Sequence, residues 1–207
     1  MKAQLVVCTN RGMDFRFVDC LLRVRHPEIS IAFGIESLID RSRSVMASQF
    51  LETDNDVLIF IDDDIIDWGI DDINQIMADV KETNSIVGGC YSIKDSEKPR
   101  ICALGIDTGE GPADIGPQMG LTEVRYVATG FMAIPRKVLE DMAKGMQKIN
   151  FYGDLVAHPF FQCLINNGVY LSEDYSFCER AARLGYKIWL DPRIILGHIG
   201  SYVYRLS

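Results

Sequence analysis

The chain has 207 residues and carries 29 acidic against 21 basic side chains, which gives it a formal net charge of −8. Its length favours one domain, and its composition, 48% hydrophobic and 24% charged, is that of an ordinary globular protein rather than a disordered or fibrous one. An acidic chain repels a phosphate backbone, so nucleic acid is not expected as a partner.

The first half of the chain alternates short β-rich runs with helical patterns. We expect strands at residues 4–8, 29–33, 57–61 and 85–89, and helices at residues 15–25, 37–51 and 71–81. In the second of these helices, the spacing turns Leu38, Met46 and Phe50 inward and leaves Arg41 and Arg43 facing solvent. Strands and helices that alternate in this way predict an α/β sandwich around a mostly parallel sheet.

The second half of the chain is less regular. Residues 105–120 hold five glycines and two prolines, which predicts a loop or a loose hairpin. Residues 123–134 are expected to form one strand, followed by a helix from Pro135 to about residue 144. Ser172 is expected to cap a further helix that Gly185 ends, and short strands follow near Ile188 and Ile194. No repeat or linker divides the chain, so residues 1–207 are expected to form a single domain.

The sequence carries no pattern for membrane insertion or export. The purest apolar run, residues 57–61, is far shorter than the roughly 20 residues that a spanning helix needs, and the N-terminus reaches Thr9 and Asn10 too soon for a signal-peptide core. The six cysteines are scattered without a Cys-x-x-Cys pair, which favours buried thiols in a reducing compartment over a disulfide framework or structural zinc. We therefore expect a cytoplasmic protein with no membrane span.

Three consecutive aspartates follow the apolar run at residues 57–61. In extended chain alternate side chains share a face, so Asp62 and Asp64 are expected to project together while Asp63 points away. At the carboxyl end of a strand they would lie over the crevice where open α/β sheets bind ligands. Carboxylate oxygens suit Mg²⁺ or Mn²⁺, which also bind diphosphate oxygens. The alternative is that the triplet only begins a solvated loop.

An acidic pair and a late histidine are further candidates. Glu173 and Asp174 fall in the first turn of a predicted helix, where the helix dipole favours an ionised carboxylate that could act as a general base. First-turn acids also occur simply as partners of the dipole. His198 lies between Gly197 and Gly200, which let the backbone approach a ligand, and a neutral imidazole can bind Mn²⁺. A lone histidine is otherwise a structural residue.

Two segments resemble a known family. Asp40-Arg41-Ser42-Arg43-Ser44, with Asp62-Asp63-Asp64 downstream, resembles the donor-binding half of GT-A glycosyltransferases, whose DxD signature lies at this place. The segment SEDYSFCERAARLGYKIWLDPRIILGHIG, residues 172–200, is similar to the C-terminal stretch of inverting glycosyltransferase family 2 and its small bacterial and viral relatives. Two departures are Ser44, where relatives often have Asn, and Ser176, where they often have Asp.

The resemblance implies a GT-A, Rossmann-like nucleotide-diphospho-sugar transferase fold, with a mixed, mostly parallel sheet flanked by helices. Residues 1–100 would bind the nucleotide and residues 101–207 the acceptor. It implies a hexosyltransferase-type enzyme that uses Mn²⁺ or Mg²⁺ to move a sugar, with inversion, from a nucleotide-diphosphate sugar to a hydroxyl of a glycan or glycoprotein. A UDP-sugar is favoured as the donor, with guanosine and thymidine donors as alternatives. Asp174 or Glu173 would be the base, and Asp62, Asp64 and His198 the metal ligands. The expected donor-binding residues are Thr9, Arg11, Arg43, Asp62, Asp63, Lys94 and Gly130.

Two other functions fit parts of the sequence. A nucleotidyltransferase also holds metals with acids on an α/β sheet, but it would want a glycine-rich phosphate loop near the first strand, where residues 9–12 contain one glycine. A catalytically silent carbohydrate-binding module would keep the fold without turnover; the presence of both acidic clusters together with His198 argues against it. Four aromatic side chains could stack on an acceptor sugar or fill the core: Phe151, Tyr152, Phe160 and Phe161.

Overall fold

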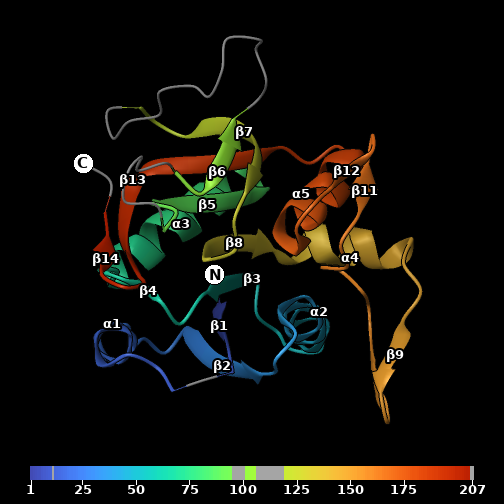
Figure 1. Ribbon diagram of the computed structural model, residues 1–207, viewed down its shortest axis with the longest axis horizontal. Helices are drawn as coiled ribbons and strands as arrows, with labels where there is room; N and C mark the ends of the chain where they lie inside the picture. Colours follow the sequence, from blue (N-terminus) through green and yellow to red (C-terminus); the bar gives the residue numbers. More distant parts are fainter. Residues whose placement is uncertain (11, 95–100, 106–118, 206–207) are drawn as a thin grey trace.

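The computed structural model describes residues 1–10, 12–94, 101–105 and 119–205. Within these ranges ten strands join in one sheet: β1 (Ala3–Thr9), β2 (Ile29–Ile35), β3 (Val57–Ile61), β4 (Ile65–Ile66), β5 (Ile86–Tyr91), β6 (Ala103–Gly105), β7 (Thr122–Val127), β8 (Phe131–Pro135), β13 (Ile188–Ile199) and β14 (Val203–Tyr204). The order is β2-β1-β3-β8-β5-β13-β7-β6, and β4 and β14 both pair with β13 (Figure 1).

The direction of the strands fixes where their ends meet. β2 and β3 both pair parallel to β1, and β5 pairs parallel to β13. β8 lies antiparallel between β3 and β5, so these two also run in the same direction. The five strands β2, β1, β3, β5 and β13 are therefore parallel, which confirms a mixed, mostly parallel sheet. Their carboxyl ends share one edge of the sheet, where ligands bind in open α/β folds.

Helices cover both faces of this sheet. One face carries α1 (Phe15–Arg23) and α3 (Ile70–Thr83), and the other carries α2 (Ile39–Phe50), α4 (Arg136–Lys144) and α5 (Glu173–Arg183). β3 is buried over its whole length because alternate side chains enter two cores. Leu58 and Phe60 pack with α2, α4 and α5, whereas Val57, Ile59 and Ile61 pack with α1 and α3.

Two hairpins lie outside the sheet. β9 (Ile149–Tyr152) pairs with β10 (Leu155–Ala157), and β11 (Ile165–Asn166) pairs with β12 (Val169–Tyr170). The first hairpin extends from the body of the molecule on the side where α2 lies (Figure 1). Among the described residues, no helix combines the length and the apolar character that crossing a bilayer requires.

Several local expectations are wrong. Residues 123–134 form two strands, because the chain turns around Gly130 and β8 then enters the sheet between β3 and β5. The strands expected near Ile188 and Ile194 are one strand, β13, whose pairing with β5 shifts register on the way. In α2, Leu38 is exposed and Arg43 is buried, the reverse of what we expected. Most of residues 105–120, the expected loop, lie outside the described residues.

Candidate functional site

The acidic triplet leaves the carboxyl end of β3 and its three carboxylates take different partners. Asp62 pairs with Arg43 of α2, and Asp63 accepts a hydrogen bond from the hydroxyl of Thr9 at the end of β1. Asp64 pairs with Lys94, which follows β5. Asp62 and Asp64 therefore share no side-chain partner, and the triplet connects three neighbouring strand ends. Burial raises the pKa of Asp63 above its ordinary value.

Arg43 is the charged side chain that links the acidic triplet to the acidic pair, which lies far from it in the sequence. The residue is only 3% exposed. Nη2 donates to Oδ1 of Asp62 at 2.7 Å, and Nη1 donates to Oε1 of Glu173. Burial disfavours the charged form, but the two carboxylates outweigh it and hold the pKa of Arg43 above its ordinary value. The expectation that Arg43 faces solvent failed because helical spacing cannot register a buried charge whose partners lie elsewhere in the chain.

Asp64 lies between a lysine and a histidine. Nζ of Lys94 is 2.5 Å from Oδ2 of Asp64, and Nε2 of His198 is 3.5 Å from the same oxygen. Nδ1 of His198 lies 2.7 Å from the carbonyl oxygen of Ser92, which can only accept, so Nδ1 donates to it and Nε2 is the ring nitrogen that faces Asp64. Burial acts to raise the pKa of Asp64, but hydrogen bonds with His198 and Lys94 outweigh it and lower that pKa.

The backbone explains how His198 reaches the triplet. β13 continues past β5 and pairs antiparallel with β4, which places His198 opposite Ile65. The amide of Ile199 donates to the carbonyl of Asp64 at 2.7 Å. We expected Gly197 to admit a ligand, but a Cβ there would lie 2.5 Å from Oδ2 of Asp67, so this glycine makes room for a carboxylate of the chain itself.

The residues present fit a divalent cation with few protein ligands. Asp64 Oδ2 and His198 Nε2, 3.5 Å apart, need only a small shift to become neighbouring ligands of one ion, each at about 2.1 Å. Asp62, the third expected ligand, is engaged by Arg43. Across the described ranges no three His, Cys, Asp or Glu side chains gather closely enough to hold an ion by themselves. Mg²⁺ commonly takes one or two carboxylates and completes its shell with phosphates and water.

Gly130 is packed against Tyr91, the last residue of β5. A Cβ on Gly130 would lie 2.4 Å from the Tyr91 hydroxyl oxygen. That oxygen accepts a hydrogen bond from the Gly130 amide at 2.9 Å, and the carbonyl of Gly130 accepts one from the amide of Asp62 at 3.1 Å. The Tyr91 ring also meets the His198 ring edge to face at 5.3 Å. Tyr91 thus braces Gly130 and His198, a role that its place at the end of an apolar strand alone did not reveal.

The acidic pair lies in the first turn of α5, and its members have different surroundings. Glu173 is held by Arg43, and burial raises its pKa despite that positive charge. Oδ1 of Asp174 accepts from the Ser172 hydroxyl and, at 2.8 Å, from the Tyr175 amide. Within the described residues Oδ2 of Asp174 has no hydrogen-bond partner. Ser172 occupies the N-cap position but makes no side-chain cap bond to the backbone, because its hydroxyl binds Asp174.

Three further candidates, Arg41, Phe160 and Phe161, make contacts outside this cluster, and a fourth cannot be placed. Arg11 is outside the described residues. Arg41 pairs with Glu36 at 2.6 Å. Phe160 and Phe161 are fully buried, so they belong to the core and cannot meet an acceptor.

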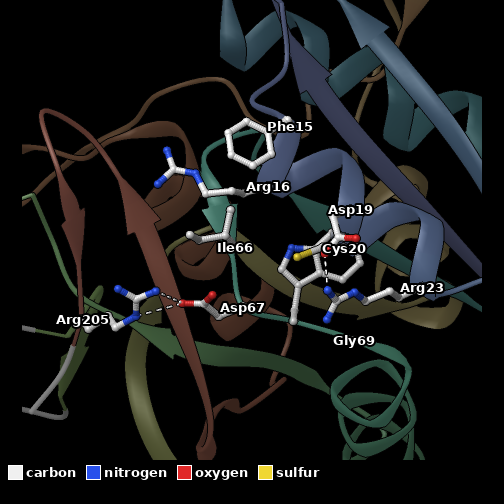
Figure 2. Close-up of a pocket in the computed structure, with 10 residues that line it drawn as sticks. Phe15, Arg16, Asp19, Cys20, Arg23, Ile66, Asp67, Gly69 and Arg205 are labelled. Atoms are coloured by element: carbon white, nitrogen blue, oxygen red, sulfur yellow. Dashed lines mark hydrogen bonds and ion pairs between the residues drawn. The ribbon is translucent and has the colours of Figure 1, made fainter.

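A cavity of about 600 Å³ lies beside the site rather than over its acids. It is bounded by α1, the residues after β4, and Arg205. Figure 2 shows two ion pairs on its wall, Asp67 with Arg205 and Asp19 with Arg23, and the third arginine of the wall, Arg16, pairs with Asp14 at 2.9 Å. Because these arginines are paired, the cavity offers no concentrated positive charge for a diphosphate.

Solved structures resemble the whole chain. No protein-family model matches the sequence, and no curated protein is significantly similar to it. The crystal structure of A197 from STIV superposes with a TM-score of 0.68 at 18% identity, covering 100% of this chain and 95% of that one. GalNAc-T7, crystallised with UDP, GalNAc and Mn²⁺, superposes with a TM-score of 0.59 at 14% identity, covering 100% of this chain and 44% of that one. These likenesses confirm the GT-A fold.

Proposed function

We propose that this protein is a metal-dependent glycosyltransferase that moves a hexose from a nucleotide-diphosphate sugar, preferably a UDP-sugar, to a hydroxyl group. The observation that carries the proposal is the convergence of its two sequence motifs. Arg43 joins Asp62 to Glu173, and Asp64 lies beside His198, so the triplet, the acidic pair and the late histidine form one cluster at the strand ends. The fold shared with GalNAc-T7, whose structure holds UDP and Mn²⁺, supports the same reading.

The donor would bind over the ends of β1, β3 and β5. Asp64 and His198 would hold Mn²⁺ or Mg²⁺ together with the diphosphate oxygens. When bound, the ion would stabilise the negative charge that develops on the departing nucleoside diphosphate. Lys94 now neutralises Asp64 at 2.5 Å and would turn to the diphosphate once a cation takes that oxygen. Thr9, Arg11 and the remaining acids Asp62 and Asp63 would border the nucleoside and the sugar, with Gly130 and Arg43 fixing the strand ends behind them.

Asp174 is the base that we favour. Glu173 is engaged by Arg43, whereas Asp174 keeps one oxygen without a hydrogen-bond partner among the described residues. Asp174 would take the proton of the acceptor hydroxyl as that oxygen bonds to the anomeric carbon. The bond from this carbon to the diphosphate breaks on the opposite side, and its electron pair leaves with the diphosphate. One displacement of this kind inverts the anomeric configuration.

The test is to incubate the purified protein with Mn²⁺ and UDP-, GDP- and TDP-sugars, with and without simple glycan acceptors, and to identify the released product. A glycosyltransferase releases nucleoside diphosphate. A parallel incubation supplies a sugar phosphate and a nucleoside triphosphate, and release of pyrophosphate there would instead identify a nucleotidyltransferase. Nucleotide-sugar binding without any turnover would identify a silent module, and either of these two outcomes would overturn the proposal.

A further inference from the structure

Two hairpins near the site carry exposed apolar side chains. Those on β9, β10, β11 and β12 are Ile149, Tyr152, Val156, Ile165, Val169 and Tyr170. Tyr152 is 57% exposed and Tyr170 is 71% exposed. Large aromatic side chains held in solvent beside a candidate site are uncommon unless they meet a partner.

The segment that bears these hairpins is fastened to the helices of the site. Ser44 and Ser48 of α2 accept hydrogen bonds from the amides of Phe161 at 3.0 Å and His158 at 2.9 Å. Ser176 of α5 accepts from the amide of Leu164 at 2.8 Å. α2 also carries Arg43 and α5 also carries Glu173 and Asp174, so the segment keeps a fixed position relative to the proposed base.

The two tyrosines lie near the first turn of α2, Tyr152 beside Arg41 and Tyr170 within range of the charge of Asp40. The guanidinium of Arg41, two residues before Arg43, lies 4.8 Å from the centre of the Tyr152 ring. Tyr170 precedes Glu173 by three residues in the sequence. A hydrogen bond with Cys163 raises the pKa of the Tyr170 hydroxyl, and the charges of Asp40 and Glu173 contribute to the same shift.

The segment is almost free of charge. Residues 149–170 include a single Asp, Glu, Lys or Arg, which is Asp154, although such residues make up 24% of the whole chain. Its polar side chains are instead amides and hydroxyls, at Asn150, Gln162, Asn166 and Asn167 as well as the tyrosines. The nearby charge of Arg41 is neutralised by Glu36 at 2.6 Å. Two arginines of α5 also contact the segment: Arg180 donates to the Phe160 carbonyl at 3.3 Å, and Arg183, which pairs with Glu179, donates to Asn166 at 3.1 Å. The hairpins themselves offer uncharged side chains, which suit sugar rings with apolar C–H faces and neutral hydroxyls.

We propose that the two hairpins form the acceptor subsite for a neutral oligosaccharide, whose sugar rings stack on Tyr152 and Tyr170. This inference rests on the proposed function, because the hairpins can bind an acceptor only if the protein is a glycosyltransferase. It adds the chemical class of the acceptor. The terminal sugar would lie toward Asp174, and the preceding sugars would contact the hairpins.

The experiment measures glycan binding by saturation-transfer NMR in the presence of Mn²⁺ and UDP. The probes are three neutral tetrasaccharides (cellotetraose, maltotetraose and mannotetraose) and the acidic tetragalacturonate. We expect at least one neutral tetrasaccharide to bind in preference to tetragalacturonate. Tyr152→Ala and Tyr170→Ala should each weaken that binding about twofold to tenfold, in line with the value of an aromatic contact, while Tyr→Phe at either position retains most of it.

A matched control is Phe15→Ala, which removes an exposed aromatic side chain from α1 on the opposite face of the sheet and should leave glycan binding unchanged. UDP binding is measured on every variant, so loss of the fold is recognised separately. If the wild type binds UDP but none of the neutral tetrasaccharides, or prefers tetragalacturonate, or if both alanine variants bind as well as the wild type, the inference is overturned. If the wild type does not bind UDP, the proposed function itself is contradicted, and this result is separate from the glycan-binding measurement.

Discussion

The guanidinium of Arg43 binds two carboxylates that come from distant parts of the sequence, Asp62 after β3 and Glu173 on α5. Arginine suits this place because its planar group donates in two directions at once, whereas a lysine ammonium is a point charge on a flexible stem. The pairing leaves Glu173 with a structural task. Among the described residues its neighbour Asp174 is bound only through Oδ1, to Ser172 and Tyr175, and it remains the better candidate for proton transfer.

Replacing Asp174 with Asn should remove transfer while leaving nucleotide binding intact. The amide cannot accept the acceptor proton, and general-base catalysis contributes a factor of about 100 to 10,000. We therefore expect release of nucleoside diphosphate in the presence of acceptor to fall at least about 100-fold. Calorimetric titration with the nucleotide should give an affinity close to that of the wild type.

The matched control for this change is Glu52→Gln, at an exposed acid that follows α2. It removes one negative charge outside the site and should keep full activity. Near-normal transfer by the Asp174 variant would show that another group takes the proton, and Glu173 would then be the next residue to replace.

At the residue scale the sequence identified the acids and His198 but not their pairing. Residue type made Asp62, Asp64, Glu173, Asp174 and His198 candidates, and the resemblance to glycosyltransferases joined them into one set. Helical periodicity placed Arg43 in solvent, because periodicity reads only the apolar positions of the helix itself. The burial of Arg43 depends on two carboxylates that the fold supplies from elsewhere, and the bracing role of Tyr91 likewise depends on the turn at Gly130.

At the scale of elements, α3 and β13 are joined by two buried acids. Asp79 is 2% exposed and Asp191 is fully buried. Arg193 binds both oxygens of Asp191 at 2.8 Å and reaches Asp79 at 3.2 Å. Burial, together with the hydrogen bond and charge of Asp191, raises the pKa of Asp79 to about 7. Burial acts to raise the pKa of Asp191, but the hydrogen bonds from Arg193 outweigh burial and lower that pKa. Asp79 and Asp191 therefore share one proton, which lies on Asp79.

This pair predicts a specific pH dependence of stability. The folded chain holds a proton on Asp79 that the unfolded chain releases near pH 3.8. The contribution of Asp79 is therefore fully present below that pH and is lost as the pH rises toward about 7. In Asp79→Asn, an amide nitrogen in place of Oδ2 can donate to Asp191 at any pH. We expect the variant to gain stability relative to the wild type between pH 4 and pH 7, roughly the interval between these two pKa values.

Urea unfolding at pH 4.5, 6 and 7.5 checks this prediction. The difference in unfolding free energy between variant and wild type should grow in favour of Asn as the pH rises. A difference that stays constant across this series would mean that Asp79 is ionised in the folded chain.

The elements of the first half were largely predictable and those of the second half less so. Residues 57–61 form an unbroken apolar run and became the central strand β3, because a strand covered on both faces needs no alternation. Residues 123–134 are largely apolar on both sides of Gly130, but they form two strands, β7 and β8, which pair with different strands of the sheet. Which strand each apolar run pairs with depends on contacts across the sheet, and local pattern does not contain them.

At the scale of the whole molecule, the sheet begins at β2 with an apolar edge. Among the described residues no strand pairs with the outer side of β2, which Figure 1 places at the end of the sheet. Ile31, Phe33 and Ile35 are exposed on the same face of this strand. Residues 29–35 contain no charge and no proline, the usual protections of an edge strand against pairing with other chains.

Replacing Phe33 with Lys should therefore reduce aggregation without loss of stability. A charge on an exposed edge disfavours pairing between chains, and a substitution at a partly exposed position changes the unfolding free energy by about 0.5 kcal/mol or less. Light scattering during heating should show a later onset of aggregation for the variant. Leu184→Lys, at an exposed apolar residue beyond α5, should leave the onset unchanged; equal shifts for both variants would mean that net charge rather than the edge controls aggregation.

The most direct measurement is the binding of UDP to the purified protein by calorimetry, with and without Mn²⁺, compared with GDP and TDP. We predict that Mn²⁺ strengthens UDP binding in the wild type and that Asp64→Asn and His198→Ala each abolish this gain. Asp67→Asn, which alters an acid paired with Arg205 three residues beyond the triplet, should retain it. The account would be contradicted if the wild type bound UDP with the same affinity with and without Mn²⁺. It would also be contradicted if Mn²⁺ still strengthened UDP binding in the Asp64 and His198 variants.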